Sequence, residues 1–386
     1  MSGYPVTETG VTVVGNPGHR RLVGFAAAAH AAGLPEPRVV PWRDVLSGAP
    51  IAFAAGPVRV DSPGEDQDVH DLLSRDGAPR DATRVEGGAV RHAALLRGLQ
   101  RIRDAVDGTP GAWLVNEPDD IAVMFDKPRA SALLAEAGVP VPHALTGPDT
   151  KVASYEHLRE LMREERRPRV FIKPAHGSSA SGVVALETSG SGRVQATTSA
   201  ELVRTAGGVE LFNALRIRKY RDEADVAALI DALCADRVHV ESWLPKLTLD
   251  GHAVDLRVLV VAGRATHVVA RASRSPMTNL HLGNARADVG AVRAAVGDEA
   301  WARAMASCVR AAGCFPRTLH VGVDLLFAVD RRRHAVGEVN AFGDLLPGVL
   351  HHGRDTWAEQ VDALVRGWRP RPPERRTAPH EDRGTA

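Results

Sequence analysis

A lysine at the end of an apolar run, followed by a loop rich in glycine and serine, is the first feature that could do chemistry. The stretch Phe171–Leu186 reads FIKPAHGSSASGVVAL and predicts a hairpin that closes over phosphate groups. Glycines let the backbone approach an anion, serines offer hydroxyl donors, and lysine supplies a compact positive charge. The candidate phosphate-binding residues are Lys173, His176, Gly177, Ser178, Ser179, Ser181 and Gly182. The lysine precedes the glycines, so this is not the GxxxxGK[ST] loop, and a structural Gly/Ser turn is the alternative interpretation.

Acidic residues lie where two later apolar runs end. One run reads VGVD and ends at Asp324, and the other reads GEVN and contains Glu338 and Asn340. If the two runs are neighbouring strands, these side chains converge. Mg²⁺ prefers oxygen ligands and is commonly held by one or two carboxylates together with substrate phosphates. The pair therefore predicts a magnesium site, with a structural ion pair as the alternative.

Arginines are concentrated between these two features. Arg257 follows Asp255 in a DLR triplet, and Arg271, Arg274 and Arg286 follow within a short stretch. The planar guanidinium group binds phosphates and carboxylates through two parallel hydrogen bonds. Any one of these arginines could simply lie on a solvent-exposed face, but the cluster favours an acidic substrate.

Lysine is rare in this chain: five of the 48 basic residues are lysines and the rest are arginines. A site that needs a compact point charge cannot simply accept the planar guanidinium fork, so a lysine retained against this bias is suggestive. Lys219 and Lys246 have no motif position, and we expect both on the surface. The run 238–244 could be a hinge whose backbone reads an adenine edge, or a plain connector.

Composition excludes several classes of protein. A chain of 386 residues exceeds one ordinary core and suits two or three lobes. A net charge of +1 gives no surplus of basic residues for neutralising the phosphates of a nucleic acid. Three cysteines without CxxC spacing argue against disulfides and structural zinc and indicate a reducing cytoplasm. The first residues lack a signal peptide, and no apolar run is long enough to cross a membrane.

The elements that must position these residues follow from apolar periodicity. The N-terminal part alternates short apolar runs with helical patterns, which predicts an open α/β lobe. A second lobe carries the strand that ends at Lys173, and a third carries antiparallel strands in a mixed sheet. Expected strands are 11–14, 38–41, 52–60, 169–173, 183–186, 238–244, 253–262, 266–272, 321–329 and 335–339, and expected helices are 19–32, 91–106, 126–137, 222–234, 287–296 and 299–312. The tail 369–386 has almost no apolar residues and should be disordered.

These segments occur in an order that resembles the ATP-grasp superfamily from Val11 through Trp368. DKPRASALLAEAGVPVP is similar to the family's first-lysine helix, FIKPAHGSSASGVV to its second lysine and phosphate-covering loop, and HVESWLP to its hinge. The family's triphosphate arginine has its counterpart in a segment similar to it, DLRVLVVAG, and its acceptor region resembles NLHLGNAR. Its two metal-binding strands resemble GVDLLFAV and GEVNAF. The resemblance is nearest to carboxylate–amine ligases of the ribosomal-protein glutamate ligase and glutathione synthetase type.

The resemblance implies an α/β protein in which an N-terminal open α/β lobe precedes a two-lobed ATP-grasp fold with ATP between the lobes. The implied division is 1–112 for the N-terminal domain, 113–240 for the central subdomain, 241–368 for the C-terminal subdomain and 369–386 for the tail. It also implies a cytoplasmic ligase that uses ATP and Mg²⁺, with one or two ions and Mn²⁺ as a substitute. Such a ligase joins a carboxylate to an amine or thiol through an acyl phosphate, acts on a small molecule or peptide, and is compatible with a homodimer. A phosphotransferase without ligation and a non-catalytic nucleotide-binding protein are the alternatives.

Roles carry over by position. The resemblance implies that Lys127 and Lys173 contact phosphate oxygens, and that Arg257, with Arg271 and Asn340, serves the transferred phosphoryl group. Asp324 and Glu338 would bind Mg²⁺, with Asn340 completing a second ion site. The adenosine would be held by Glu241, Trp243, Leu244 and Asp250. After GEVN many relatives have Pro-Gly within a few residues, but here it comes only at Pro347, so the acceptor side is expected to differ.

Overall fold

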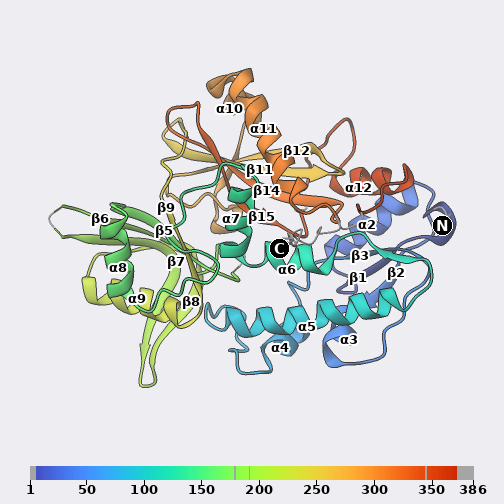
Figure 1. Cartoon of the computed structure of the whole chain (residues 1–386), viewed down its shortest axis with the longest axis horizontal. Coiled ribbons are helices and arrows are strands. Elements are labelled where there is room, and N and C mark those ends of the chain that lie inside the picture. Colours follow the sequence, from blue (N-terminus) through green and yellow to red (C-terminus); the bar gives the residue numbers. More distant parts are fainter. Residues whose placement is uncertain (1–5, 178–179, 191, 344–345, 372–386) are drawn as a thin grey trace, which may run out of the picture.

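The computed structural model describes residues 6–177, 180–190, 192–343 and 346–371, which form three β-sheets with helices packed around them (Figure 1). The first and third sheets share buried apolar clusters, whereas the second sheet has a cluster of its own. Within the described part of the chain, no helix has the length and apolarity needed to cross a bilayer. Residues 372–386 of the tail lie outside the described residues, so the expectation of disorder there stays a prediction.

The first sheet is parallel, with the strand order β2-β1-β3-β4. Its strands are β1 (Thr12–Gly15), β2 (Arg38–Pro41), β3 (Gly56–Val60) and β4 (Ala112–Leu114), and its helices are α1 (Val6–Thr9), α2 (Arg20–Ala31), α3 (Trp42–Ser47), α4 (Gln67–Ser74) and α5 (Gly88–Asp107). Every residue of β1 and β3 is buried, which is typical of a parallel strand covered on both faces. The chain passes from β1 to one side and returns as β3 on the other, so the loops after these two strands diverge.

The second sheet is antiparallel, with the order β8-β7-β6-β5-β9. Its strands are β5 (Arg169–Pro174), β6 (Val184–Thr188), β7 (Val194–Thr205), β8 (Gly208–Tyr220) and β9 (Val238–Ser242), and its helices are α8 (Tyr155–Glu164) and α9 (Glu223–Ala235). The β7–β8 hairpin and α8 were not expected from the sequence. The hairpin turns at Ala206–Gly207, and a Gly-Gly pair between β-branched residues is the signal that could have predicted it.

The third sheet has the order β13-β12-β11-β14-β15, with β10 paired to β11. Its strands are β10 (Thr248–Leu249), β11 (His252–Val261), β12 (Arg264–Ser273), β13 (Ala285–Ala287), β14 (His320–Phe327) and β15 (His334–Asn340), beside the 3₁₀ turn η1 (Leu280–Leu282), α10 (Val289–Val296) and α11 (Asp298–Gly313). All pairings given for these strands are antiparallel, so the expectation of a mixed sheet was wrong. The helices α6 (Pro118–Met124) and α7 (Lys127–Glu136) follow the first sheet along the chain.

The last helix, α12 (Thr356–Val365), returns to pack on α2 (Figure 1). Gly24 in the middle of α2 permits this approach, because a Cβ there would lie 2.7 Å from the Trp357 ring. The helix begins after Asp355, whose side chain accepts hydrogen bonds from two of the first backbone N–H groups. His351 and His352 precede this helix in a turn.

The expected domain boundaries stay predictions. β4 belongs to the first sheet and crosses the boundary set at residue 112, and β9 crosses the one set at 240. Of the three cysteines, Cys234 and Cys308 are buried and Cys314 is partly buried, and all three are free thiols. Burial raises the pKa of Cys308 to about 12, so this thiol remains protonated and packs as a small apolar group.

Candidate active site

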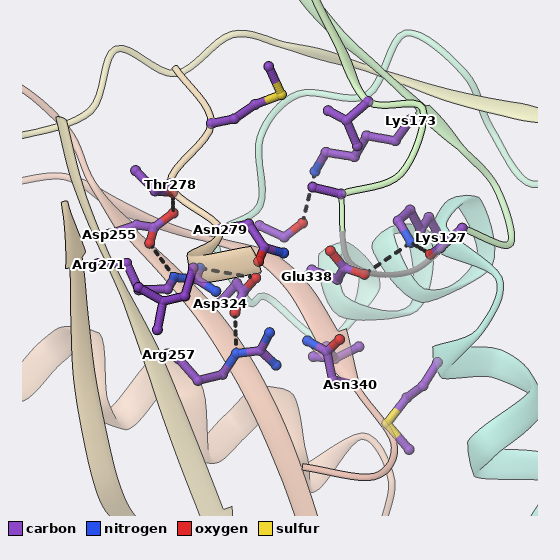
Figure 2. A pocket seen from close by; sticks show the side chains of 18 of the residues that line it. Lys127, Lys173, Asp255, Arg257, Arg271, Thr278, Asn279, Asp324, Glu338 and Asn340 are labelled. Atoms are coloured by element: carbon purple, nitrogen blue, oxygen red, sulfur yellow. Dashed lines mark hydrogen bonds and ion pairs between the residues drawn. The ribbon is translucent and has the colours of Figure 1, made fainter. Parts of the chain in front are cut away.

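One cavity of about 500 Å³ is lined by residues that come from all three sheets (Figure 2). The second sheet contributes Lys173 and Glu241, the third contributes the arginines and acidic residues, and the loops of the first sheet close the far end. Of the residues predicted from the sequence, the cavity is lined by Lys127, Lys173, Gly177, Glu241, Leu244, Arg257, Arg271, Asp324, Glu338 and Asn340. The residues assigned to phosphate, metal and phosphoryl transfer thus meet at one place.

Strand register explains why the charged residues of the third sheet converge. Arg257 on β11 is the cross-strand partner of Asp324 on β14, and Asp324 is in turn the partner of Glu338 on β15. Cross-strand partners point to the same face of a sheet. Asp255 and Asn340 are each two residues along the chain from a member of this row, so they share its face.

The arginines and carboxylates of this face are joined in a chain of ion pairs. Arg257 Nε lies 2.7 Å from Asp324 Oδ1, and Arg271 bridges Asp324 at 3.2 Å and Asp255 at 2.7 Å. Burial opposes the ionisation of Asp255, but Arg271 and Lys246 hold its pKa well below the usual range. The guanidinium groups are therefore fixed in place before any ligand binds.

Two lysines from different elements reach the same region. Lys173 Nζ lies 2.7 Å from Glu241 Oε1 and donates to Gly337 O at 3.2 Å, and Lys127 Nζ lies 3.0 Å from Glu338 Oε1. Burial raises the pKa of Glu241, but the Lys173 ammonium outweighs it and brings that pKa to about 2. Both lysines are thus paired with carboxylates that phosphate oxygens could replace.

Local structure fixes Lys127 at the first turn of α7. Asp126 caps the helix by accepting a hydrogen bond from Arg129 N at 3.1 Å, and Pro128 occupies a position where no backbone donor is needed. The backbone N–H of Lys127 donates to Ala175 O at 3.0 Å, which ties the helix start to the end of β5. Lys127 also donates through Nζ to Gly177 O, and this contact joins it to the glycine-containing loop.

Lys246 corrects the sequence-based expectation, because it lines the cavity instead of the outer surface. Only 10% of its side chain is exposed, and Nζ lies 3.0 Å from Asp255 Oδ2 and 2.9 Å from Thr278 Oγ1. Three of the five lysines of the chain, residues 127, 173 and 246, therefore line one cavity. Lys219, the other lysine expected on the surface, is exposed.

Several predicted residues lie beside the cavity lining instead of in it. His176 stacks on His92 with ring centroids 3.9 Å apart, and Trp243 packs on Phe171 at 5.2 Å. Asp250 is exposed in the turn between β10 and β11.

The structure also gives the positions of the other predicted loop residues and of the two arginines that do not line the cavity. Ser181 is half-buried, and Gly182 has a φ of 68° and no room for a Cβ beside Val85. Arg274 and Arg286 are exposed. Ser178 and Ser179 lie outside the described residues.

The donor set fits a magnesium ion shared with a substrate. Asp324 and Glu338 present carboxylates from adjacent strands, and Asn340 lies on the same face with its Nδ2 3.5 Å from Gly322 O. Among the described residues there is no group of three or more His, Cys, Asp and Glu side chains that could enclose a metal by itself. Mg²⁺ is usually bound by one or two carboxylates plus phosphate oxygens, so this sparse set suits it.

The far end of the cavity contains residues that sequence reasoning missed. They are His19, Arg20, Arg21, Ser62, Gly64 and Glu65, from the loops after β1 and β3. Neither the loop after β1 nor the loop after β3 was assigned a role from the sequence, because neither carries a recognised phosphate or metal motif. Only the parallel pairing of β1 with β3 brings the two loops together.

Comparisons with known proteins agree with this architecture. No protein-family model matches the chain, and no curated protein sequence matches it. Among solved structures, the ATP-grasp ligase PsnB with a minimal precursor, Mg and ADP is 20% identical, with 92% of this chain and 97% of that chain covered and a TM-score of 0.52. D-cycloserine synthetase DcsG is 16% identical (92% and 98% covered, TM-score 0.55). The macrocyclase MdnC with its precursor peptide MdnA, from Microcystis aeruginosa, is 12% identical (92% and 99% covered, TM-score 0.52).

Proposed function

We propose, from the premise that this chain has the ATP-grasp fold, that it is an ATP- and Mg²⁺-dependent ligase. It activates a carboxylate as an acyl phosphate and passes the acyl group to an amine or a thiol. A carboxylate is a poor electrophile because resonance spreads its charge and an oxide ion leaves badly. In the first step a carboxylate oxygen bonds to the γ-phosphorus of ATP, the bond from that phosphorus to the β-bridging oxygen breaks, and ADP leaves.

Different residues of the cavity bind the phosphate oxygens and neutralise the transferred group in this step. Lys127 and Lys173 leave their carboxylate partners for phosphate oxygens, and Arg257 neutralises the transferred group. Asp324 holds Arg257 at 2.7 Å and also contacts Arg271, so both guanidinium groups are oriented in advance. Phosphoryl transfer asks little covalent chemistry of a protein, and such pre-positioned charges supply most of the catalysis.

Asp324 and Glu338 would hold Mg²⁺, and Asn340 would add an oxygen to a second ion, with Mn²⁺ as a substitute metal. Bound there, the ion would neutralise charge that develops on the β- and γ-phosphate oxygens. Glu241 and Leu244, at the end of β9, line the part of the cavity assigned to adenine. In the second step the nucleophile attacks the acyl carbon, phosphate leaves with its bonding electrons, and the nucleophile loses a proton.

One observation carries this proposal: the row Arg257–Asp324–Glu338 on three adjacent strands faces Lys127 and Lys173, which come from other parts of the fold. A non-catalytic nucleotide-binding protein has no need of the complete set. A phosphotransferase would use the same set and stop after the first step, so the reaction products separate these two alternatives.

The test is a screen for ADP release with panels of carboxylates and amines, with mass detection of the products. A condensed product with ADP and phosphate supports ligation, whereas a stable phosphorylated product shows phosphoryl transfer alone. Glu338→Ala should abolish ADP release and leave the fold intact. Glu160→Ala is the matched control, because this exposed glutamate on α8 lies outside the cavity. Unchanged turnover in Glu338→Ala would refute the metal assignment.

A further inference from the structure

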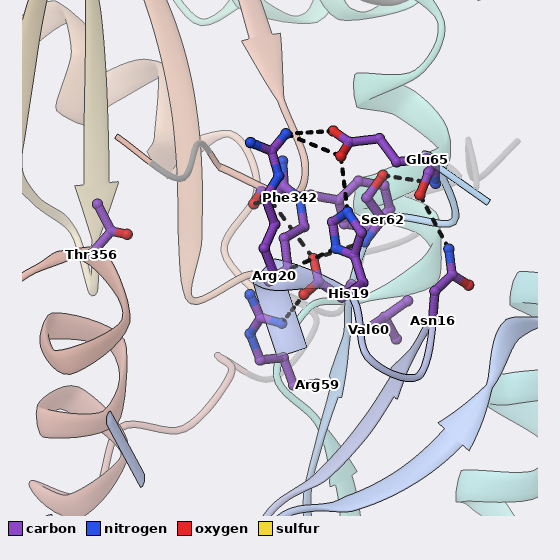
Figure 3. A network of polar contacts seen from close by, with 12 residues as sticks. Asn16, His19, Arg20, Arg59, Val60, Ser62, Glu65, Phe342 and Thr356 are labelled. Carbon is purple, nitrogen blue, oxygen red and sulfur yellow. Dashed lines mark hydrogen bonds and ion pairs between the residues drawn. The ribbon is translucent and has the colours of Figure 1, made fainter. Parts of the chain in front are cut away.

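The far end of the cavity is lined by residues that follow β1 and β3 of the first sheet. Figure 3 shows the polar contacts among these side chains. Between β1 and β3 the order of the strands reverses, and the loops that follow them diverge. In open α/β sheets this reversal creates a crevice at the carboxyl ends of the strands, and ligands bind there. His19 and Arg20 come from the loop and helix after β1, and Ser62 and Glu65 follow β3. All four line the same cavity as Arg257.

The charged groups at and directly behind this end carry a small excess of positive charge. Three guanidinium groups, those of Arg20, Arg21 and Arg59, accompany two carboxylates, those of Asp61 and Glu65, which leaves one positive charge before His19 is considered. Arg59 and Asp61 form a pair 2.7 Å apart with only 2% of either side chain exposed. That buried pair is part of the scaffold, so a ligand anion can replace a carboxylate only in the pair of Arg20 and Glu65.

Glu65 occupies Arg20 and His19 in a way that a ligand anion can imitate. Its two carboxylate oxygens lie 2.7 and 3.0 Å from Arg20 NH2, and Oε2 lies 3.0 Å from His19 Nε2. The pair is half-exposed, at 56% for Arg20 and 53% for Glu65, and exposed ion pairs contribute little to stability. Exchange of one carboxylate for another on Arg20 is therefore inexpensive.

The backbone of Glu65 supports this exchange. Its φ of 64° lies in the left-handed region, which non-glycine residues adopt at a cost. In that backbone conformation the side chain contacts Arg20 and His19. A ligand anion that takes over these contacts would therefore remove what favours the strained backbone.

We infer that this end of the cavity binds a second anionic group of the carboxylate substrate, a carboxylate or a phosphate, which takes the place of Glu65 on Arg20 and His19. The inference rests on the proposed function, because the reacting carboxylate must lie beside Arg257 at the other end. It names the substrate class as a small molecule with anionic groups at both ends. A monocarboxylate would leave the Arg20–Glu65 pair undisturbed.

The test compares matched probes by isothermal titration calorimetry in the presence of AMPPNP and Mg²⁺. The probes are dicarboxylates from malonate to adipate, the monocarboxylate with the same number of carbons as each, and phosphonocarboxylates of the same lengths. At least one doubly anionic probe should bind about tenfold more tightly than its monocarboxylate, as expected for one added charged hydrogen bond. The phosphonate series shows whether the far group is a carboxylate or a phosphate.

Two variants with opposite expected effects make the test decisive. Arg20→Gln should remove the preference for the doubly anionic probe, because the cation that binds the far group is lost. Glu65→Gln should strengthen binding of that probe by roughly threefold, because the competing carboxylate is gone. Arg43→Gln, which removes an exposed arginine away from this cavity, should change nothing.

The inference is overturned if no matched pair of probes differs in the wild-type protein. It is also overturned if Arg20→Gln and Glu65→Gln change binding in the same direction, which would mark a purely structural pair. Failure of the proposed function looks different: the product screen would then give no condensed product, whatever the preference of the wild-type protein among anions.

Discussion

The two ends of the cavity hold their charges in different ways. At the end assigned to the nucleotide, the ion pairs are buried: the exposed fractions are 13% and 6% for Lys173 and Glu241, and 6% and 4% for Arg271 and Asp255. At the far end, Arg20 and Glu65 are both more than half exposed. Buried pairs are costly to break and so fix geometry, whereas an exposed pair exchanges partners readily. The difference suits an invariant nucleotide at one end and a selected substrate at the other.

Lys173→Met, which breaks a buried ion pair, should have the largest effect on stability and activity. The substitution leaves Glu241 buried without its ammonium partner, so the free energy of unfolding should fall by about 3–5 kcal/mol. ADP release should fall by roughly 10²–10³-fold, as for other single groups that stabilise developing charge. Urea unfolding and an ADP-release assay measure the two effects. Arg20→Gln is the control at the exposed end and should cost at most about 1 kcal/mol of stability.

Equal losses of stability in these two variants would contradict the contrast between the ends. Lys219→Met gives the baseline for removal of an exposed lysine, and it should match the wild-type protein in both assays.

A smaller effect is expected from Lys246→Ala, which tests whether the unexpected third lysine belongs to the nucleotide end. Asp255 would keep Arg271 and Thr278, so the fold should survive. The loss of one charge should raise the KM for ATP about tenfold with little change in kcat, the signature of lost uniform binding. Steady-state kinetics measure this split, and an unchanged KM would return Lys246 to a purely structural role.

The smallest effect concerns pH and the stacked pair His92 and His176, which lies beside the cavity. Burial, together with the neighbouring His176, lowers the pKa of His92 from 6.5 to about 4. Between these values the unfolded chain binds a proton that the folded protein does not, so stability falls as pH drops from 6.5 to 4. The slope is at most about 1.4 kcal/mol per pH unit, and solvent screening reduces it.

His92→Phe keeps a ring beside His176 and removes the titrating group. Urea midpoints measured across this pH window should therefore fall less steeply for His92→Phe than for the wild-type protein. The hydrogen bond from Arg20 is the main reason that the pKa of Glu65 is lowered to about 2, so the Glu65 carboxylate should keep its charge over the same range. Parallel curves for the two proteins would show that His92 does not titrate as described.

The sequence predicts those parts of the site that depend on local patterns. Lys173, Asp324 and Glu338 each lie at or near the end of an apolar run, and alternation along a strand fixes which face they share. Local patterns also set some strand bounds: Arg38–Pro41 was predicted with its observed bounds. Helix α7 begins one residue after its predicted start, because the capping residue Asp126 was counted as helical.

The parts that could not be predicted depend on contacts between distant segments. Lys246 reaches Asp255 because β10 pairs with β11 and folds the chain back, and its second partner, Thr278, is 32 residues away. Glu65 meets Arg20 across 45 residues, through the parallel pairing of β1 and β3. Nothing in the residues around Lys246 or Glu65 indicates these partners.

The most direct test of the central claim, that a carboxylate is activated by phosphorylation, follows oxygen atoms. The carboxylate substrate found in the ADP-release screen is labelled with ¹⁸O in both carboxylate oxygens, and the phosphate formed during turnover is examined by mass spectrometry. An acyl phosphate transfers one labelled oxygen to each phosphate released, and this is the predicted result. Phosphate that carries no label while ADP and condensed product accumulate would contradict the account.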